Sequence, residues 1–412
     1  MKTNASLRNF LLSVYGYAFF NKFLLISPVY SIFMQNHGIS ELQFSLLFVM
    51  LSLSTIISQI PVVWIVSKLG RKNTIMLGQL LKGIGFITWL VWPTFPGFIL
   101  GMCLWGMMSA VYSSVFEAMI YDELSARRHN NLYARVLGMR YTVQAVGAGM
   151  AAFGSLLMFA GYECITIASL VSLLLSVLCI SRVKTLAKGE NHTRVRRTNN
   201  VKIFKTAFRV FHATPCVFLM MLLCLFVTNF SYVDDFLSPI GIEIGLPVAY
   251  VGSMQFLVLG CMIIGQTFAY RFEKIKDWIL YGAICVLGTC FLLFSLHYAV
   301  AGLLWFGLAY ILSSGLYILL YSRFQDFIPP SYRTVILSFY NIASHIVYIV
   351  MCLVMGFGGT LGSWRYSIVG VGCLLISVGI WALTFIRNKC ARNFKPYKNA
   401  IKTMHEVGSD IV

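Results

Sequence analysis

Long apolar stretches separated by short polar segments run through the whole chain. Each holds about 20 residues, enough for a helix rising about 1.5 Å per residue to cross a hydrocarbon core. The stretches are too long, and too rich in Leu, Gly and aromatic residues, for the alternating strands of a membrane β-barrel. Twelve helical spans are predicted, at 9–34, 42–66, 74–94, 97–121, 132–159, 162–181, 214–242, 247–270, 278–297, 299–322, 334–357 and 365–386.

Composition supports a protein embedded in the lipid bilayer. Of the 412 residues, 58% are hydrophobic and 11% are charged, proportions that exclude a water-soluble domain of this length. The 11 cysteines lie almost all within predicted spans and have no metal-ligand spacing. They are therefore interpreted as small buried residues, and no metal or cofactor is expected.

The positive charge lies on one side of the predicted spans. A net charge of +18 in a soluble protein would suggest nucleic-acid binding. Here 28 of the 32 Lys and Arg residues fall in the N-terminal tail, the even-numbered loops and the C-terminal tail. Under the positive-inside rule this asymmetry predicts a multi-pass plasma (inner) membrane protein with both termini in the cytoplasm. No nucleic-acid partner is expected.

The longest polar segment divides the spans into six and six. Between spans six and seven lie nine basic residues and one acidic residue, a composition that favours a linker held at an anionic membrane surface. Four parts are predicted: an N-terminal six-helix bundle at 1–181, a cytoplasmic basic linker at 182–213, a C-terminal six-helix bundle at 214–386 and a cytoplasmic tail at 387–412.

Two short matches between the halves indicate an internal duplication. "HGISELQFS" (37–45) follows span one as "IGLPVAYVGS" (244–253) follows span seven. "YARVLGMRY" (133–141) opens span five as "YRTVILSFY" (332–340) opens span eleven. Both pairs lie about 200 residues apart, and a shared offset favours duplication over chance.

Two local motifs carry a family resemblance. The loop "SKLGRKNTI" (67–75) contains Gly70, Arg71 and Lys72, and span four ends in "FEAMIYDEL" (116–124), which contains Asp122. Arg135 opens span five. In these stretches the chain resembles the major facilitator superfamily of secondary transporters, and its bacterial efflux-type members in particular. The resemblance implies that these five residues form a gating motif.

The loop departs from the family pattern upstream of Gly70. Ser67 stands where the family usually has aspartate, and Val63 where it has glycine. Span five contributes "GAGMAAFGS" (147–155), whose small residues allow close approach to a neighbouring helix, either at a domain interface or in ordinary packing.

The resemblance covers essentially the whole chain and implies a fold. It predicts an all-α membrane protein with twelve transmembrane helices in two pseudo-symmetric six-helix bundles around a central cavity. A monomer is expected. Spans 1, 4, 7 and 10 are expected to line that cavity, where a small-molecule substrate and protons bind. The cavity-lining candidates are Tyr17, Asn21, Tyr232, Tyr310 and Tyr317.

Six ionisable residues lie deep within predicted spans. A charge at bilayer depth costs at least about 2.5–3.5 kcal/mol, so each must pair, reach an interface or face water. These residues are Lys22, Lys82, Glu117, Arg140, Asp234 and Asp235.

Depth along the helices suggests partners for some of these residues. Glu117 and Arg140 lie at equal depth on spans four and five, which predicts an ion pair between them; alternatively, Glu117 faces the cavity and contacts substrate or proton. Lys82, on a helix outside the expected cavity wall, is predicted to extend its amine to the cytoplasmic face.

The centre of predicted span one carries a positive charge, which requires a negatively charged partner. Lys22 lies there, and we expect it to pair with Asp234 or Asp235 of span seven. On a continuous helix, Thr228, Ser231 and Tyr232 share a face with Asp235, which favours Asp235 as the cavity carboxylate and Asp234 for an inter-helix bond. Asp235 could then exchange a proton as the cavity changes sides. A purely structural ion pair is the alternative.

Secondary transport is the function that this pattern favours. The leading hypothesis is proton-coupled efflux of amphipathic, drug-like compounds. The first alternative is uptake of an anionic nutrient or iron chelator (siderophore), with Lys22 and Arg140 as contacts; the second is a transporter-like membrane sensor. An enzyme is not expected, because the chain has no HExxH, no GxSxG and no paired histidines.

Overall fold

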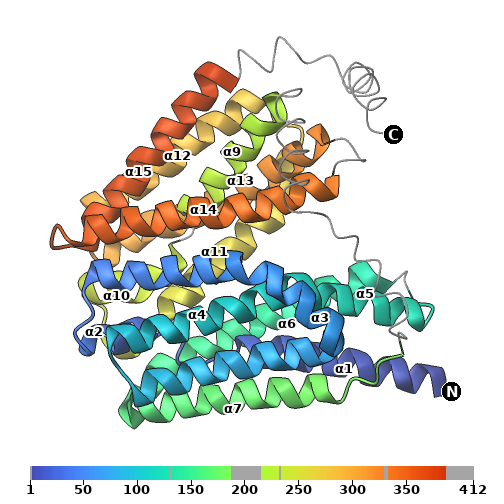
Figure 1. The fold of residues 1–412 in the computed structure, drawn as a ribbon. Coiled ribbons are helices and arrows are strands. Elements are labelled where there is room, and N and C mark those ends of the chain that lie inside the picture. Colours follow the sequence, from blue (N-terminus) through green and yellow to red (C-terminus); the bar gives the residue numbers. More distant parts are fainter. Residues whose placement is uncertain (1, 130–131, 187–214, 232, 329–332, 387–412) are drawn as a thin grey trace. The chain divides into compact units, whose positions relative to one another are not determined.

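The computed structural model describes residues 2–129, 132–186, 215–231, 233–328 and 333–386. Every regular element in these residues is a helix (Figure 1). The prediction of an all-α protein is therefore confirmed.

The backbone forms two compact units. The first comprises Met1–Arg196 with Asp234–Leu259, and the second comprises Arg197–Val233 with Gly260–Val412. The segment 234–259, which the sequence placed in the C-terminal bundle, is thus grouped with the first unit. The boundaries at 181, 213 and 386 stay predictions.

The first unit contains most of the elements of the N-terminal half and a later segment. Its helices are α1 (Lys2–Lys22), α2 (Tyr30–Asn36), α3 (Glu41–Val91), α4 (Phe95–Val111), the π-helical turn η1 (Tyr112–Phe116), α5 (Glu117–Ala126), α6 (Tyr133–Ala151), η3 (Ala152–Ala160), α7 (Gly161–Ser181), η5 (Asp234–Phe236), α10 (Leu237–Glu243), η6 (Val248–Tyr250) and the first part of α11 (Gly252–Phe268).

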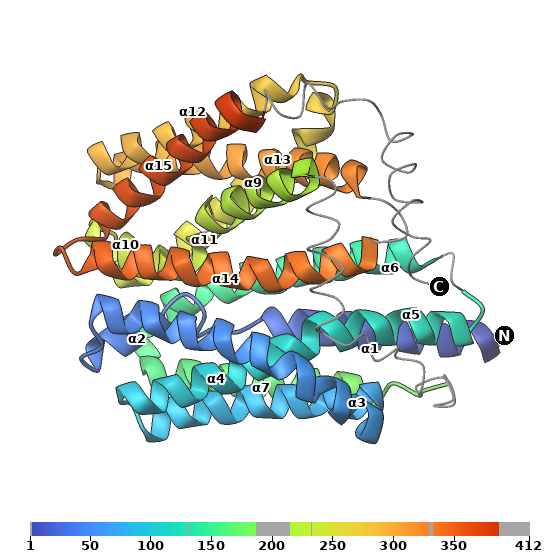
Figure 2. The ribbon, with the colours of Figure 1, turned by 45° about the horizontal axis from the view of Figure 1, so that its top comes forward.

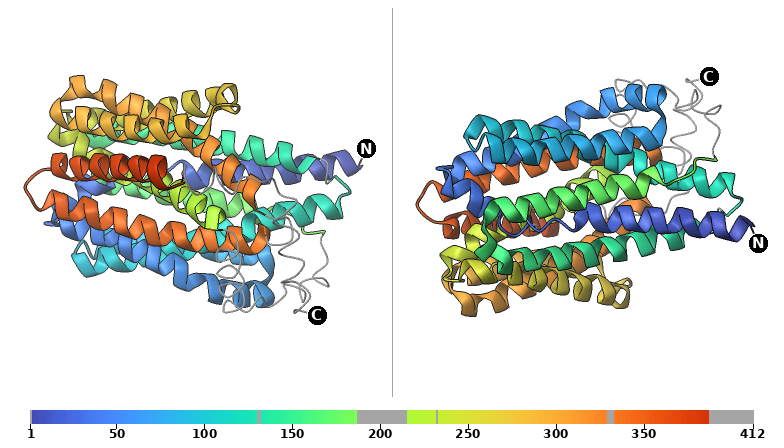
Figure 3. Two further views of the ribbon diagram at one scale, coloured as in Figure 1. Left: turned by 90° about the horizontal axis from the view of Figure 1, so that it is seen from above. Right: turned by 90° about the horizontal axis from the view of Figure 1, so that it is seen from below.

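Helix packing in the first unit centres on α1. This helix lies between α6 and α7, and α3 packs along α4 (Figures 1 and 3). Buried apolar side chains join these elements, among them Val14 of α1, Ile75 of α3, Ile120 of α5, Val136 of α6 and Ile180 of α7. Burial of apolar area against neighbouring helices fixes the positions of the helices that carry the charged residues described below.

Two predicted spans form one element with a break. Gly70, at φ 75° and ψ 164°, lies outside the helical region and divides α3 into two helices. Glycine suits this position because a side chain disfavours positive φ. At the start of α3, Ser40 accepts a hydrogen bond from the Gln43 amide and donates its own amide to the Gln43 side chain, a capping box.

Spans one and seven were each predicted as one helix, and this was wrong. α1 ends at Lys22, residues 23–29 form turns, and α2 begins at Tyr30. Pro28 lacks an amide hydrogen and disfavours helical geometry at the residue before it, which accounts for the break.

The second break lies in span seven. Helix α9 (Pro215–Ser231) is followed by the 3₁₀ turn η5 and then by α10. Pro239, in the first turn of α10, cannot donate the backbone hydrogen bond that would continue an α-helix through Asp235.

Close packing of α6 explains the small residues of span five. A Cβ on Gly147 would lie 2.6 Å from the Phe19 carbonyl oxygen of α1. Gly154 in η3 meets the Leu25 carbonyl oxygen in the turns after α1, again at a distance that leaves no room for a side chain. These contacts lie within the first unit, so they represent tight helix packing there.

The second unit is also helical. α12 lies beside α15 and α13, α13 packs against α9, and α14 packs against α15 and α9 (Figures 1 and 2). Besides α9 and the rest of α11, its elements are η7 (Ala269–Phe272), α12 (Asp277–Leu296), η8 (Val300–Gly302), α13 (Leu303–Phe327), α14 (Arg333–Gly359), α15 (Trp364–Trp381) and η10 (Ala382–Ile386).

The described residues contain eight helical stretches that are long and apolar enough to cross a membrane. Two of them, Glu41–Val91 and Arg135–Ser181, each include two of the predicted spans. The count of twelve and the division into two six-helix bundles stay predictions.

Candidate functional site

The predicted ion pair between Glu117 and Arg140 is present. Arg140 on α6 donates from Nη2 to Oε1 of Glu117, the first residue of α5, at 2.7 Å. The Tyr141 hydroxyl donates to the same oxygen at 3.0 Å. Arg140 is only 1% exposed, so Glu117 and the surrounding rings supply its compensation within the protein.

Aromatic rings complete the surroundings of Arg140. Its guanidinium carbon lies 4.3 Å from the centre of the Tyr141 ring and 5.6 Å from that of Tyr112. Gln144 donates a hydrogen bond to the Tyr112 hydroxyl. Tyr112 belongs to the π-helical turn η1, a local distortion of the kind often found at functional sites.

The carboxylate of Asp235 is bonded to Tyr30, which lies far from it in the sequence but in the same unit. The Tyr30 hydroxyl of α2 donates to Oδ1 of Asp235 at 3.3 Å. Nearby, the Ser238 hydroxyl donates to the Pro28 carbonyl oxygen at 2.6 Å, and the Phe236 ring packs against Phe48 with centres 5.6 Å apart. These contacts hold η5 and α10 against the break between α1 and α2.

Lys22 interacts electrostatically with the two aspartates. It is the last residue of α1, and its side chain is exposed. Its charge is coupled most strongly to Asp235 and next to Asp234. The expected pairing of Lys22 with one of these aspartates stays a prediction. A role in coupling stays a prediction.

The two aspartates differ in exposure and geometry. Asp235 is half-buried and Asp234 is exposed. The helical spacing that placed Thr228 and Ser231 on the face of Asp235 does not apply, because α9 ends at Ser231. Tyr232 lies outside the described residues.

A sequence signal for this site was overlooked. "KFLLISP" (22–28) and "DFLSP" (235–239) share Phe-Leu after the charged residue and end in Ser-Pro. The first predicted span of each half is thus broken, and each break lies beside a charged residue, Lys22 in one half and Asp235 in the other. Interrupted helices at corresponding positions of internal repeats are the best sequence pointer to a transporter binding site.

The predicted position of Lys82 was wrong. Its side chain is 4% exposed and does not extend to the end of the helix. Instead, Nζ lies 4.6 Å from the centre of the Trp105 ring and 5.9 Å from that of Phe86. The sequence placed Lys82 on a helix outside the expected cavity wall and gave no sign that the Trp105 ring of the following helix α4 lies beside its amine.

The remaining cavity candidates are largely buried. Asn21 accepts a hydrogen bond from Gln79 at 3.0 Å. The Tyr17 ring is fully buried, 4.6 Å from the Phe116 ring centre. Tyr310 in the second unit is also fully buried, and its hydroxyl accepts from the Val233 amide at 3.1 Å. Neither tyrosine ring reaches a solvent-accessible surface, whereas Tyr317 is half-buried.

The gating-motif residues make specific contacts in the first unit. Arg71, directly after the break at Gly70, forms an ion pair with Asp122 and donates to the Ala118 carbonyl oxygen at 2.5 Å. Lys72 donates to the Ser181 carbonyl oxygen at 2.7 Å. Ser67, which replaces the family's aspartate, bonds locally to the Trp64 carbonyl oxygen.

The other predicted member of the motif lies apart from these bonds. Arg135 is exposed near the start of α6. Its gating role stays a prediction, as do those of Gly70, Arg71, Lys72 and Asp122.

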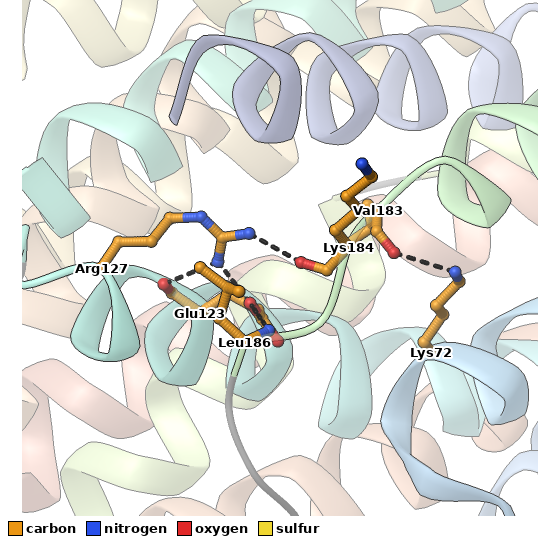
Figure 4. A network of polar contacts seen from close by, with 6 residues as sticks. All are labelled: Lys72, Glu123, Arg127, Val183, Lys184 and Leu186. Atoms are coloured by element: carbon orange, nitrogen blue, oxygen red, sulfur yellow. Dashed lines mark hydrogen bonds and ion pairs between the residues drawn. The ribbon is translucent and has the colours of Figure 1, made fainter. Parts of the chain in front are cut away.

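A second polar cluster near this motif was not predicted. Glu123 and Arg127 form a nearly buried ion pair at the end of α5. Arg127 donates to the Lys184 carbonyl oxygen at 2.8 Å, and the Leu186 amide donates to Glu123 at 3.0 Å. Figure 4 shows these bonds beside the one from Lys72 to Val183. Together they attach the residues that follow α7 to α3 and α5.

Within the described residues, no group of three or more His, Cys, Asp or Glu side chains could hold a metal ion. The polar groups of the first unit are ion pairs, a lysine among aromatic rings, and a tyrosine–aspartate hydrogen bond. Such groups can bind a solute or a proton.

An all-helical chain with repeated membrane-length apolar helices is an integral, multi-pass membrane protein. More specifically, the chain belongs to the Major Facilitator Superfamily, whose sequence pattern it matches over residues 11–351. It is a transporter and not an enzyme, and members of this family bind small-molecule substrates. No curated protein sequence matches the chain significantly.

Solved transporter structures share the fold. A bacterial homologue of the human lysosomal transporter Spinster, in an inward-facing conformation, is 15% identical with a TM-score of 0.66, covering 93% of this chain and 95% of the other. The nucleoside transporter NupG is 12% identical with a TM-score of 0.69, covering 93% and 99%. A D-xylose–proton symporter is 12% identical with a TM-score of 0.69, covering 92% and 97%. At these identities, the likeness shows the fold alone.

Proposed function

We propose that the protein is a proton-coupled secondary transporter that exports amphipathic, drug-like compounds across the plasma (inner) membrane by alternating access. In this proposal the chain functions as a monomer with both termini in the cytoplasm. Twelve helices in two six-helix bundles provide the two halves that alternate in access.

The observation that carries the proposal is the pair of matched helix breaks with charged residues. Lys22 ends α1, and Asp235 lies in the turn between α9 and α10. Unwound backbone and ionisable side chains are costly in a membrane, and both are retained chiefly where a protein binds a solute or an ion. A break beside a charged residue in the first predicted span of each half supports a shared binding role.

A proton at Asp235 offers a coupling mechanism. The ionised carboxylate attracts Lys22 and accepts the hydrogen bond from Tyr30. Protonation removes the attraction to Lys22 and changes the interaction with Tyr30, so it alters the forces that hold η5 to the end of α1. Proton binding can thereby bias the conformational equilibrium. A structural neighbour named as a proton symporter makes proton coupling plausible on this fold.

Uptake of an anionic nutrient or iron chelator is the second candidate. It is favoured by the exposed cation of Lys22. Arg140, the other contact expected for such a substrate, forms a 2.7 Å ion pair with Glu117. A solute anion would have to compete with that carboxylate, which makes Arg140 a weaker candidate contact than Lys22.

Transport direction can be tested in everted membrane vesicles from cells that produce the protein. With an acidic vesicle interior, export predicts that fluorescent amphiphiles accumulate inside and that a protonophore abolishes the accumulation. Vesicles from cells lacking the protein provide the background. If no amphiphile of a broad panel accumulates above background, the export proposal is wrong; proton-dependent accumulation in right-side-out vesicles would favour uptake.

A further inference from the structure

Lys82 is a buried cation within an aromatic environment. Its side chain is 4% exposed on α3, and its ammonium nitrogen lies 4.6 Å from the centre of the Trp105 ring. A cation over an aromatic face is stabilised, but less than by an anion in direct contact. The aromatic contact alone leaves much of the cost of burying this charge uncompensated.

The protein provides Lys82 with a neighbouring positive charge. Among the ion pairs between described residues, none includes Lys82. Lys22 is a neighbouring cation that repels the charged form of Lys82. The acidic partners Asp235 and Asp234 act on Lys22 instead. An anion placed between the two lysines would therefore relieve their repulsion and compensate Lys82.

A hydrogen bond joins the helical segments that carry the two lysines. Asn21, adjacent to Lys22 at the end of α1, accepts from Gln79 of α3 at 3.0 Å. Gln79 precedes Lys82 by almost one helical turn, so it lies on the same side of α3. Asn21 and Gln79 are both buried. This contact joins the end of α1 that carries Lys22 to the stretch of α3 that carries Lys82.

Flat rings surround this part of the first unit. The Trp105 ring centre lies 5.7 Å from that of Phe86, 6.0 Å from that of Trp89 and 6.3 Å from that of Tyr30. Tyr30 also carries the hydrogen bond to Asp235. Aromatic faces favour contact with a planar ring in a bound molecule.

We propose that Lys82 and Lys22 bind the negative group of the transported solute, and that this solute is an organic anion with a carboxylate or phosphate attached to an aromatic ring. The anion contacts both ammonium groups, and the ring packs against the aromatic side chains around Trp105. This inference rests on the proposed transport function and specifies its substrate class.

The test is a set of matched ligands on the purified full-length protein in detergent. The anions are benzoate, 1-naphthoate, indole-3-acetate and 1-naphthyl phosphate; their neutral counterparts are the three amides and 1-naphthol. Thermal unfolding is measured against ligand concentration, because a ligand that binds the native state raises the midpoint. At least one anion is expected to stabilise the protein at concentrations at which its neutral counterpart does not.

Variants locate the binding site. Lys82→Met is expected to weaken binding of the stabilising anion at least tenfold, whereas Lys82→Arg keeps the charge and is expected to stay within threefold of the native protein. Lys68→Met is the matched control, because Lys68 is exposed and lies 5.3 Å from the Trp64 ring centre. It should leave binding unchanged.

Two results would overturn the inference. One is that no anion stabilises the native protein more than its neutral counterpart. The other is unchanged anion binding in Lys82→Met. The first result needs no variant, so it decides the matter even if Lys82→Met fails to fold. Because these measurements use no proton gradient, anion binding without proton-driven transport would reject the proposed coupling and leave the anion site standing.

Discussion

At Arg140, one carboxylate and several aromatic rings hold a guanidinium that is 1% exposed. Glu117 supplies the carboxylate and is 38% exposed, so water reaches one partner of the pair but not the other. Removing the carboxylate would leave the buried guanidinium without a negatively charged partner, which costs more free energy than exposing the carboxylate itself. The stability of the α5–α6 packing therefore depends on the negative charge of Glu117.

Replacing Glu117 tests this dependence. Glu117→Gln is expected to lower the free energy of unfolding by about 1–3 kcal/mol, below the value for a fully buried pair because Glu117 is partly exposed. Thermal unfolding of the purified protein measures the effect. Glu163→Gln, at an exposed site on α7, is the control.

A double variant separates loss of the pair from general damage. Adding Arg140→Met to Glu117→Gln removes the uncompensated cation and is expected to restore part of the lost stability. If Glu117→Gln unfolds at the same temperature as the native protein, Arg140 does not depend on this carboxylate.

Residue partners were predictable from sequence only where they lay at equal depth on consecutive helices. Glu117 and Arg140 satisfied that condition. Tyr30 and Asp235 are 205 residues apart in the chain, and nothing local connects them. Lys82 was misplaced because its environment depends on Trp105 in the following helix.

At the scale of the helices, the breaks within predicted spans and the close contacts between helices position the charged residues, and the length of an apolar stretch does not reveal either. Apolar composition predicted helices correctly because membrane spans must satisfy their backbone internally. The same composition continues through residues 23–29 and around Asp235, so it concealed both breaks. Pro28 and Pro239 were the sequence signal for the two breaks, because proline has no amide hydrogen for the helical hydrogen bond.

The packing of α6 on α1 gives a prediction at this scale. A Cβ at Gly147 would lie 2.6 Å from the Phe19 carbonyl oxygen. Gly147→Ala is therefore expected to destabilise the protein by about 1–3 kcal/mol through overpacking. Thermal unfolding in detergent measures the change.

Gly138 provides a control on the same helix. A Cβ there meets nothing within 4 Å, so Gly138→Ala is expected to leave stability unchanged or raise it by about 0.5–1 kcal/mol through helix propensity. Equal effects of the two substitutions would show that the close approach at Gly147 does not limit stability.

At the scale of the whole molecule, the first predicted span of each half is broken beside a charged residue, and the two charges are opposite. Lys22 is the last residue of α1, and Asp235 lies in η5, between α9 and α10. In the first unit these charges interact, and Tyr30 adds a hydrogen bond to the carboxylate. A proton on Asp235 changes both interactions, so a small chemical event can bias the conformation of the transporter.

The most direct measurement of this central claim compares two activities of Asp235→Asn in liposomes. For a solute that the native protein accumulates, one assay measures proton-driven accumulation and the other measures exchange of the solute without a gradient. Asparagine keeps the size of the side chain but cannot exchange the proton. Asp234→Asn serves as the neighbouring comparison.

If Asp235 carries the coupled proton, Asp235→Asn loses proton-driven accumulation. Its rate of gradient-free exchange stays within about threefold of the native rate, which RT ln 3 converts to less than about 1 kcal/mol. Asp234→Asn is predicted to retain accumulation. Proton-driven accumulation by Asp235→Asn at the native level would show that Asp235 does not carry the coupled proton.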